Sequence, residues 1–369
     1  DGNTMQEVIT VAKALEKAGI TLLNTGIGWH EARIPTIVTS VPRAAFVDYT
    51  AEVKKHVSVP VIASNRINMP DTAEAILASG QADMVQMARP LLADAFWVNK
   101  TATNRVDEIN TCIACNQACL DHTFKNQRAT CLVNPRAGYE TELVYVKTKK
   151  PKSIAVIGGG VAGLSAATGA ASRGHDVTLF EASHEVGGQF NLAKVIPGKE
   201  EFHETIRYFK VQLEKTGVDV RLNTRVNREQ LEREGFDEVI VATGVVPRAL
   251  NIEGSQAPQV LSYAEVLRGA PVGDRVAVIG AGGIGFDVSE FLLKPPHQIQ
   301  PQPVNEWKRE WGVDSQPDYV TEGGLQRAEV EPPVREIYLL QRKKTTLGAG
   351  LGKTSGWVHR AQLKKHAVR

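Results

Sequence analysis

Two glycine-rich segments constrain the fold more than any other feature of the sequence. Residues 158–163 (GGGVAG) directly follow the apolar stretch IAVI, and residues 280–285 (GAGGIG) follow the similar stretch VAVI. Glycines at this spacing, between a strand and a helix, permit a tight turn and a close approach of the backbone to a pyrophosphate. The motif glycines are Gly158, Gly160 and Gly163 in the first segment and Gly280, Gly282 and Gly285 in the second. The sequence therefore predicts two Rossmann-type dinucleotide-binding units.

The surroundings of the first motif favour a flavin over a nicotinamide nucleotide. Glu181 ends the next expected strand, where a carboxylate can accept a hydrogen bond from a ribose hydroxyl. A Gly187–Gly188 pair follows, and a later strand over 238–244 ends in Ala-Thr-Gly. Alone, the Gly-Gly pair would be read as an ordinary turn. Together these features predict an FAD domain.

The second motif is separated from its next strand by an insertion. Residues 295–333 hold seven of the 18 prolines and show little periodicity, so we expect a loop there. The strand EIYLLQRKK then ends in Arg342 and Lys343. A basic pair at this point would neutralise the 2′-phosphate of NADPH, whereas a carboxylate would select NADH. The alternative is a solvated basic strand end.

The N-terminal third alternates strands and helices, which predicts a parallel sheet. Strands are expected at 20–26, 59–64 and 82–88, and helices at 4–19, 46–57 and 69–80. A (β/α)₈ barrel needs eight strands. The pattern is therefore interpreted as the C-terminal part of such a barrel whose beginning is missing; the alternative is a small three-layer α/β unit.

Polar side chains follow these strands, where active sites of barrels lie. Arg66 and Arg89 are candidates for binding a cofactor phosphate, since guanidinium groups match phosphate oxygens. His30 is a candidate general acid or base because imidazole titrates near neutral pH. The alternatives are a surface charge for each arginine and a solvated side chain for the histidine.

All four cysteines lie between positions 112 and 131, with the spacing C-x2-C-x3-C-x11-C. They are Cys112, Cys115, Cys119 and Cys131. Four thiolates can bind a [4Fe–4S] cluster or a tetrahedral zinc ion. The spacing leaves iron–sulfur, zinc and structural thiols open, in that order. Disulfides are disfavoured because nothing indicates secretion.

Composition excludes several classes of protein. The 43 basic and 41 acidic side chains leave a net charge of +2, which gives no support for nucleic-acid binding. No apolar run approaches the ~18 residues needed to span a membrane. We therefore expect small-molecule partners, with neither nucleic acid nor membrane among them.

Several blocks make the chain similar to the bacterial NADPH-dependent 2,4-dienoyl-CoA reductases, relatives of trimethylamine dehydrogenase and the old yellow enzymes. The blocks are GIGWHEARIPTI (26–37), SNRIN (64–68), ADMVQMARPLLAD (82–94), INTCIACNQACLD (109–121), CLVNPRAG (131–138), GGQFNLAK (187–194), IPGKEEF (196–202) and LGKTSGWVHR (351–360). The resemblance implies a cytoplasmic enzyme with an FMN-binding TIM barrel, a [4Fe–4S] segment and two nested Rossmann-like domains for FAD and NADPH. The predicted boundaries are 1–104, 105–150, 151–268 and 269–369. Compared with this family, the chain is expected to be truncated at both ends.

The resemblance also implies roles for individual residues. It makes His30 the histidine that assists a tyrosine in delivering a proton, and the four cysteines the cluster ligands. It makes Arg66, Ala88, Arg89 and Gln117 FMN contacts. It makes Ala162, Glu181, Gln189, Lys199 and Val226 FAD contacts, and Arg342 and Lys343 the NADPH 2′-phosphate site. Glu31, Ala32, Arg33 and Trp357 are weaker candidates for contacting a substrate or ligand.

The implied function is NADPH-dependent reduction of 2,4-dienoyl-CoA thioesters to enoyl-CoA in the β-oxidation of unsaturated fatty acids. Electrons would pass from NADPH through FAD, the cluster and FMN to the substrate. The alternatives are an NAD(P)H:flavin oxidoreductase or enoate reductase acting on another substrate, an amine dehydrogenase, and a non-catalytic electron-transfer subunit. The basic pair at 342–343 argues against an amine dehydrogenase, and the WHEAR motif argues against a simple electron carrier.

Overall fold

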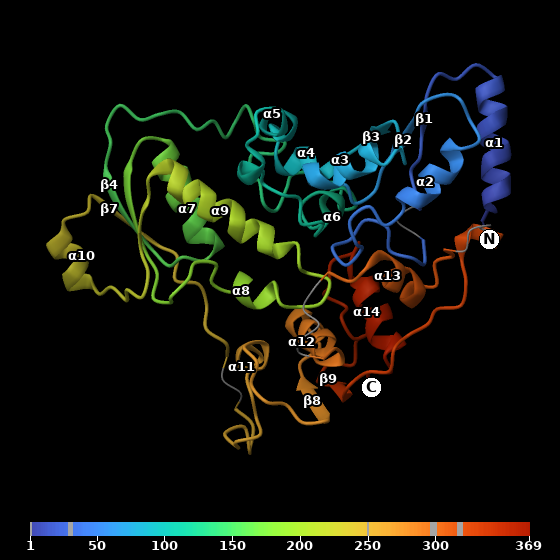
Figure 1. Cartoon of the computed structure of the whole chain (residues 1–369). Helices are drawn as coiled ribbons and strands as arrows, with labels where there is room; N and C mark the ends of the chain where they lie inside the picture. The colour runs from blue at the N-terminus through green and yellow to red at the C-terminus, as the bar shows by residue number, and fades with distance from the viewer. Residues whose placement is uncertain (1, 29–31, 249–250, 296–300, 316–319) are drawn as a thin grey trace.

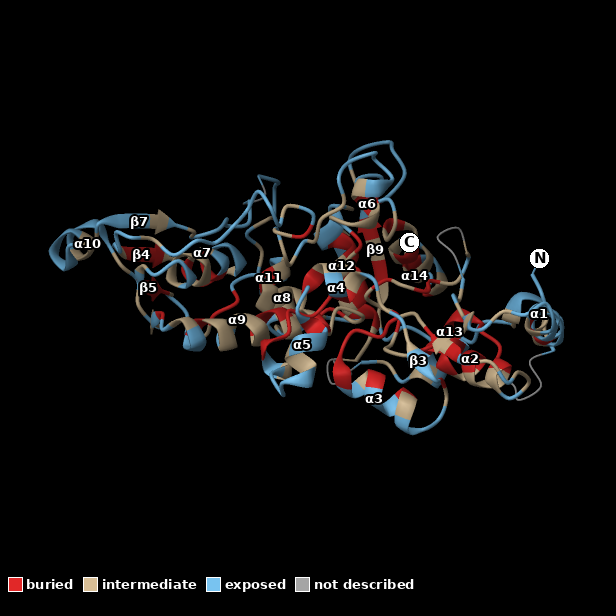
Figure 2. Cartoon of the chain, turned by 90° about the horizontal axis from the view of Figure 1, so that it is seen from above, coloured by how far each residue is buried: buried red, intermediate tan, exposed pale blue. Residues whose placement is uncertain are grey.

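The computed structural model describes the chain apart from residues 1, 29–31, 249–250, 296–300 and 316–319 (Figure 1). Its strands form three separate parallel sheets that follow one another along the sequence. The chain is elongated: helices α1 and α10 lie at opposite ends and are largely exposed, while buried segments gather between them (Figure 2). None of the helices in the described part of the chain has the length and apolar character that crossing a membrane requires.

The N-terminal unit has the predicted alternation of strands and helices. Its sheet has the order β1-β2-β3 and is parallel throughout. The strands are β1 (Leu23–Asn24), β2 (Val61–Ala63) and β3 (Met84–Val85), and the helices are α1 (Met5–Lys17), α2 (Val47–Lys54) and α3 (Pro70–Ala78). Helix α1 begins with a capping box in which Thr4 and Glu7 satisfy each other's backbone N–H groups. Ala63 and Ile76 belong to the core between β2 and α3.

An irregular segment containing the cysteines follows this unit. It holds only short helices: α4 (Arg89–Ala93), α5 (Trp97–Ala102), the 3₁₀ turn η1 (Val106–Glu108) and α6 (Leu120–Thr123). Ile109 and Ile113 are almost fully buried, so side-chain burial fixes this segment where regular hydrogen bonding does not.

The flavin-type unit predicted from the first glycine motif has a four-stranded parallel sheet of order β6-β5-β4-β7. Its strands are β4 (Ser153–Ile157), β5 (Asp176–Phe180), β6 (Asp219–Arg221) and β7 (Glu238–Val241). Its helices are α7 (Val161–Ser172), α8 (Phe190–Ala193), α9 (Phe202–Thr216) and α10 (Arg228–Glu234). Helices α7 and α9 pack on each other beside the sheet, and Leu164 and Leu213 belong to the shared core.

The unit built on the second motif has two parallel strands, β8 (Arg275–Ile279) and β9 (Glu336–Leu340). Helix α12 (Gly283–Leu293) packs against both strands and against α11 (Tyr263–Leu267) and α14 (Gly356–Lys365). Phe286 and Leu339 are buried in its core. The predicted fold class, a partial TIM barrel with an irregular cysteine segment and two Rossmann-like units, agrees with this architecture.

The expectation of a loop over 295–333 was wrong for part of the described residues in this range. Helix α13 (Val304–Trp311) and the turn η2 (Glu322–Gly324) form within it. Trp307 and Trp311 lie in a buried cluster with Val41 and Phe46 of the N-terminal unit. Lys308, 1% exposed, forms an ion pair with Asp48. Helix α13 is thus stabilised by burial against residues far away in the sequence, which local periodicity does not reveal.

Candidate functional site

A cavity of 1160 Å³ lies where the units meet. Cys115 and Gln117 of the cysteine segment line it together with Lys199 of the flavin-type unit and His359 of helix α14. The segments that contribute to its wall are 38–43, 197–204, 301–303, 306–307, 309–311 and 329–332. Residues from every predicted domain therefore face one common space.

The four cysteines form a cage beside this cavity. All four have free thiols, and they surround a small, almost entirely apolar space together with Arg89, Ile113 and Leu132. Burial raises the pKa of Cys115 to about 12 and that of Cys131 to about 11, and the neighbouring thiols add to both effects. Four free thiols around one space are suited to binding a metal centre, whose binding would displace their protons.

The spacing of the sulfurs distinguishes between the two metal centres that the sequence left open. In the described part of the chain, no three of these sulfurs lie within 4.8 Å of one another. Zinc–sulfur bonds of about 2.3 Å would bring four ligand sulfurs to about 3.8 Å from each other. A [4Fe–4S] cluster carries one thiolate on each of four irons and needs a wider cage. The cysteine cage therefore fits the cluster better than a zinc ion.

Two of the predicted FMN residues are arginines near the cysteine segment: Arg89 is half-buried and lines the cage, whereas Arg66 is buried and lines the large cavity. Arg89 donates to the carbonyl of Ile37 over 2.8 Å and to the side chain of Asn116. Burial lowers the pKa of Arg89, while the electrostatic effect of the nearby cysteines, Cys112 foremost, opposes this shift. Arg66 donates to the carbonyl of Val41 over 2.6 Å. The other two predicted FMN residues, Ala88 and Gln117, are exposed.

The structure adds Glu201, a residue that the sequence analysis did not single out. Its carboxylate, 7% exposed, accepts from Arg66 at 2.8 Å, from Arg43 at 2.8 and 2.9 Å, and from Asn68 at 3.1 Å. Burial disfavours its charge, but the guanidinium groups of Arg66 and Arg43 outweigh burial and hold the pKa of Glu201 at about 2. Glu201 lies in the IPGKEEF block, but only the tertiary structure brings it to Arg66.

The first glycine turn has the geometry that the motif predicts. Gly158 has a φ of 107°, and a Cβ on Gly163 would lie 1.8 Å from the carbonyl oxygen of Gly158. The Glu181 carboxylate accepts from the N–H of Gly159 at 2.6 Å, so it stands beside the turn. Gly187 pairs with this turn, since its N–H donates to the carbonyl of Gly159 over 2.8 Å. Glycines and carboxylate are thus brought together.

The remaining predicted FAD residues are less uniformly placed. Ala162 is exposed on the first turn of α7, Gln189 is exposed and donates to the carbonyl of Val245, and Val226 is half-buried. Lys199 is instead held by an ion pair to Asp287 at 2.5 Å. None of these four positions contradicts an FAD contact, which stays a prediction for each of them.

The second glycine turn repeats the geometry of the first. A Cβ on Gly285 would lie 1.8 Å from the carbonyl oxygen of Gly280, and Gly282 precedes α12 as its N-cap. Arg342 and Lys343 are exposed directly after β9, at the same edge of the sheet as this turn. Parallel strands end at a common edge, so the basic pair lies on the side where a dinucleotide would bind.

The weaker ligand candidates are placed by the structure only in part. The ring of Trp357 packs edge-on against that of Trp311, with ring centroids 6.3 Å apart. Trp357 thus belongs to the hydrophobic cluster around α13. Ala32 is half-buried and Arg33 is exposed. His30 and Glu31 lie outside the described residues.

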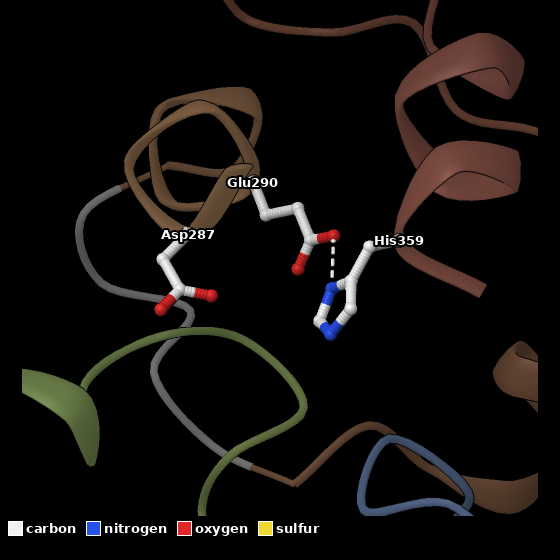
Figure 3. A group of neighbouring side chains, drawn as sticks. All are labelled: Asp287, Glu290 and His359. Carbon is white, nitrogen blue, oxygen red and sulfur yellow. Dashed lines mark hydrogen bonds and ion pairs between the residues drawn. The ribbon is translucent and has the colours of Figure 1, made fainter. Parts of the chain in front are cut away.

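A cluster of three titratable side chains, which the sequence analysis also did not single out, lies in the nicotinamide-type unit. Asp287 and Glu290 of α12 and His359 of α14 have ligand atoms within 4.8 Å of one another (Figure 3). His359 Nδ1 lies 2.8 Å from Glu290, and Asp287 pairs with Lys199. Burial lowers the pKa of His359, but the carboxylate of Glu290 outweighs it and the pKa is raised. Both carboxylates are thus already paired, Glu290 with His359 and Asp287 with Lys199.

Two known protein families match separate parts of the chain. Residues 1–108 match the NADH:flavin oxidoreductase / NADH oxidase family, and residues 152–353 match the pyridine nucleotide-disulphide oxidoreductases. A metal reductase of Desulforamulus reducens is 36% identical over 99% of this chain and 54% of its own length. A cinnamate reductase of Clostridium sporogenes is 34% identical over 81% of this chain and 45% of its own length. The chain spans about half the length of the curated relatives it matches.

A solved structure extends the similarity to the whole chain. A 2-naphthoyl-CoA reductase in complex with 2-naphthoyl-CoA superposes with a TM-score of 0.85 at 30% identity, covering 100% of this chain and 50% of that one. A histamine dehydrogenase of Rhizobium, with a TM-score of 0.74 at 20% identity, shares the fold.

These matches confirm the predicted TIM-barrel and Rossmann-like folds and the predicted FMN, FAD and nicotinamide cofactors. The cysteine cage supplies four ligands for the predicted [4Fe–4S] cluster. Of the predicted resemblance, the old yellow enzyme-like part is confirmed, whereas the matches do not single out dienoyl-CoA reductases. The chain belongs to the pyridine nucleotide-disulphide oxidoreductase family and carries this module behind an old yellow enzyme-like NADH:flavin oxidoreductase module.

Proposed function

We propose that the protein containing this chain uses NADPH to reduce the conjugated double bonds of a 2,4-dienoyl-CoA thioester. The observation that carries the proposal is the position of the cysteine cage: Cys115 lines the same cavity as Lys199 of the flavin-type unit and Arg66 of the barrel part. A centre in this cage would stand between two flavin-binding units. Such a position suits an electron relay from a nicotinamide to a substrate-reducing flavin.

The relay explains why the chain combines these units. When bound, the flavins exchange hydride with nicotinamide and substrate, whereas an iron–sulfur cluster carries single electrons. The chain's own residues hold the parts: Gly158 and Glu181 shape the dinucleotide turn, and Arg66 and Arg89 place positive charge beside the cage. Ile113 and Leu132 give the cage apolar walls.

Arg342 and Lys343 support NADPH as the electron donor. Both are exposed after β9, and at this position Asp or Glu would bind the free ribose hydroxyl of NADH. His30 is proposed to protonate the substrate together with a tyrosine outside this chain, as the resemblance implies. Location in the bacterial cytoplasm belongs to the same proposal.

The substrate class rests on two similarities of different kind. The 2-naphthoyl-CoA reductase superposes over the whole chain, and its ligand is a conjugated acyl-CoA thioester. The cinnamate reductase supports the second candidate, reduction of a conjugated free acid by an enoate reductase of the same architecture. Both candidates reduce a carbon–carbon double bond conjugated to a carbonyl, and they differ in whether the substrate carries coenzyme A.

The test is anaerobic turnover by the full-length protein, followed as NADPH oxidation. We expect 2,4-hexadienoyl-CoA to be reduced at least about tenfold faster than cinnamate or sorbate at equal concentration, because a site built to bind a CoA thioester discriminates against its absence. Faster turnover of the free acids would overturn the thioester proposal in favour of the enoate reductase. The Cys115→Ser variant should lose iron and substrate reduction while still oxidising NADPH with an artificial acceptor.

A further inference from the structure

Helix α9 of the flavin-type unit contacts the chain immediately before Cys112. The guanidinium group of Arg207 donates to the carbonyls of Asp107 and Ile109, the latter over 2.7 Å. It also donates to the hydroxyl of Thr111 over 3.1 Å. Arg207 thus ties the turn η1 and the irregular backbone after it to a helix of another unit.

Glu201, at the start of the same helix, reaches Cys112 itself through Asn68. The amide Nδ2 of Asn68 donates to Glu201 over 3.1 Å and to the carbonyl of Cys112 over 3.0 Å. Asn68 is 2% exposed and Cys112 is 8% exposed. The side-chain amide of Asn68 has two N–H groups, and these two bonds use both of them. The carboxylate of Glu201 therefore fixes the orientation in which Asn68 donates to the carbonyl of Cys112.

Glu201 also balances charge next to the cysteine cage. Its two oxygens bind the guanidinium groups of Arg66 and Arg43, both contributed by the barrel part. Arg66 is in turn close enough to Arg89 for the two charges to interact, and Arg89 faces the thiols of Cys112 and Cys119. A single buried carboxylate therefore holds two arginines and one amide at the side of the cage.

We propose that Glu201 is a positioning residue for the iron–sulfur centre, through which the FAD unit sets the geometry and electrostatic environment of the ligand Cys112. The inference rests on the proposed function, since it requires that the cage holds a cluster. Residues that orient a metal ligand tune the affinity and the redox potential of the metal. Here that residue, Glu201, belongs to the FAD unit, which would supply the electrons. A charge in a water-poor surrounding acts strongly on a redox centre nearby.

The experiment uses the full-length protein with all its cofactors and compares Glu201→Gln with the wild type. The variant keeps the size of the side chain but removes the carboxylate that pairs with Arg66, while Arg43 keeps its ion pair with Glu204. Uncompensated positive charge stabilises the reduced cluster, so its midpoint potential, measured by EPR-monitored titration, should shift to more positive values. Release of iron to a chelator should be about tenfold faster, the lower end of what loss of such a partner costs.

Two further variants separate positioning from a purely structural role. Glu214→Gln removes an exposed carboxylate from the same helix and should change neither the potential nor the release of iron. Asn68→Leu removes both N–H donors while keeping volume, and it should speed iron release as Glu201→Gln does. Combining the two should add little, because they interrupt one path. Additive effects on iron release would contradict a path through Asn68.

The outcomes distinguish this inference from the proposed function. If the wild type binds no cluster, the proposed relay fails and the inference fails with it. If the wild type binds a cluster and Glu201→Gln shifts neither potential nor iron release, only the inference is overturned. A Glu201→Gln variant that unfolds at lower temperature but keeps the wild-type potential would also overturn the inference alone.

Discussion

Lys199 of the flavin-type unit and Asp287 of helix α12 form an ion pair of 2.5 Å that joins the two dinucleotide-binding units. Lys199 is 16% exposed and Asp287 is 22% exposed at the side chain, so the pair is partly shielded from solvent. Asp287 belongs to the group with Glu290 and His359 (Figure 3). Lys199 of one unit and the group of Asp287, Glu290 and His359 of the other therefore lie together at the shared cavity. We expect the protonation of His359 to affect the stability of this contact.

The pair of His359 and Glu290 should make stability depend on pH. The pKa of His359 is raised in the folded chain despite its burial, because the carboxylate of Glu290 favours the charged ring. The groups that face His359 are Glu290, Asp287 and Lys199. A raised folded pKa gives stabilisation that is complete below the unfolded value of about 6.5 and is lost as pH rises through the folded value.

We therefore expect the thermal midpoint of the wild type to fall more steeply than that of His359→Gln as pH rises above about 6.5. Differential scanning fluorimetry at a series of pH values measures this difference. The exposed His184, changed to Gln, provides the control and should follow the wild type. Parallel curves for wild type and His359→Gln would show that the pair does not stabilise the fold.

The basic pair after β9 should determine the choice of nicotinamide. Changing Arg342 and Lys343 to Ala removes two positive charges from the edge where a 2′-phosphate would bind, so KM for NADPH should rise at least about tenfold. KM for NADH should change little, because NADH lacks that phosphate. Stopped-flow reduction of the flavin by each nucleotide measures both, and Lys344→Ala, the neighbouring exposed lysine, is the matched control. Equal losses with both nucleotides would remove the assignment.

Gly163→Ala should abolish FAD binding. Its Cβ would lie 1.8 Å from the carbonyl oxygen of Gly158, so helix α7 must move away from the strand. Forcing atoms into a packed turn costs roughly 1–3 kcal/mol, and it also displaces the N–H groups that a pyrophosphate needs. Flavin content of the purified protein and its absorption spectrum give the readout. Gly273→Ala, where an added Cβ meets nothing within 4 Å, should keep its flavin.

Removing Trp307 should destabilise the inserted segment and its contact with the barrel part. The side chain is 1% exposed and packs edge-on against Phe46, with ring centroids 5.7 Å apart. Trp307→Ala should cost about 3–5 kcal/mol of unfolding free energy through lost burial and the cavity left behind. Urea denaturation followed by circular dichroism measures it, and Trp307→Phe should lose less. Val320→Ala, 66% exposed in the same insertion, should remain within error of the wild type.

The sequence alone was sufficient where local residue pattern dictates local geometry. Both glycine turns, Glu181 beside the first turn and the parallel pairing of their strands appear as predicted, because a strand, a positive-φ glycine and a helix specify one another at short range. The cysteine spacing likewise predicted four thiols acting together, since the residues lie within one short segment. The cysteine spacing left the identity of the metal centre undecided, because the residue type of the ligands does not fix the distances between their sulfur atoms.

Only the tertiary structure decided what lies between the units. The sequence provided no sign that Glu201 binds Arg66, that Lys199 binds Asp287, or that α13 carries two buried tryptophans. These contacts join residues far apart along the chain, and a side chain's partner at such a distance depends on how whole elements pack. Local pattern thus determined the two dinucleotide turns and the four-thiol set, whereas packing between units decided which charges are buried together beside them.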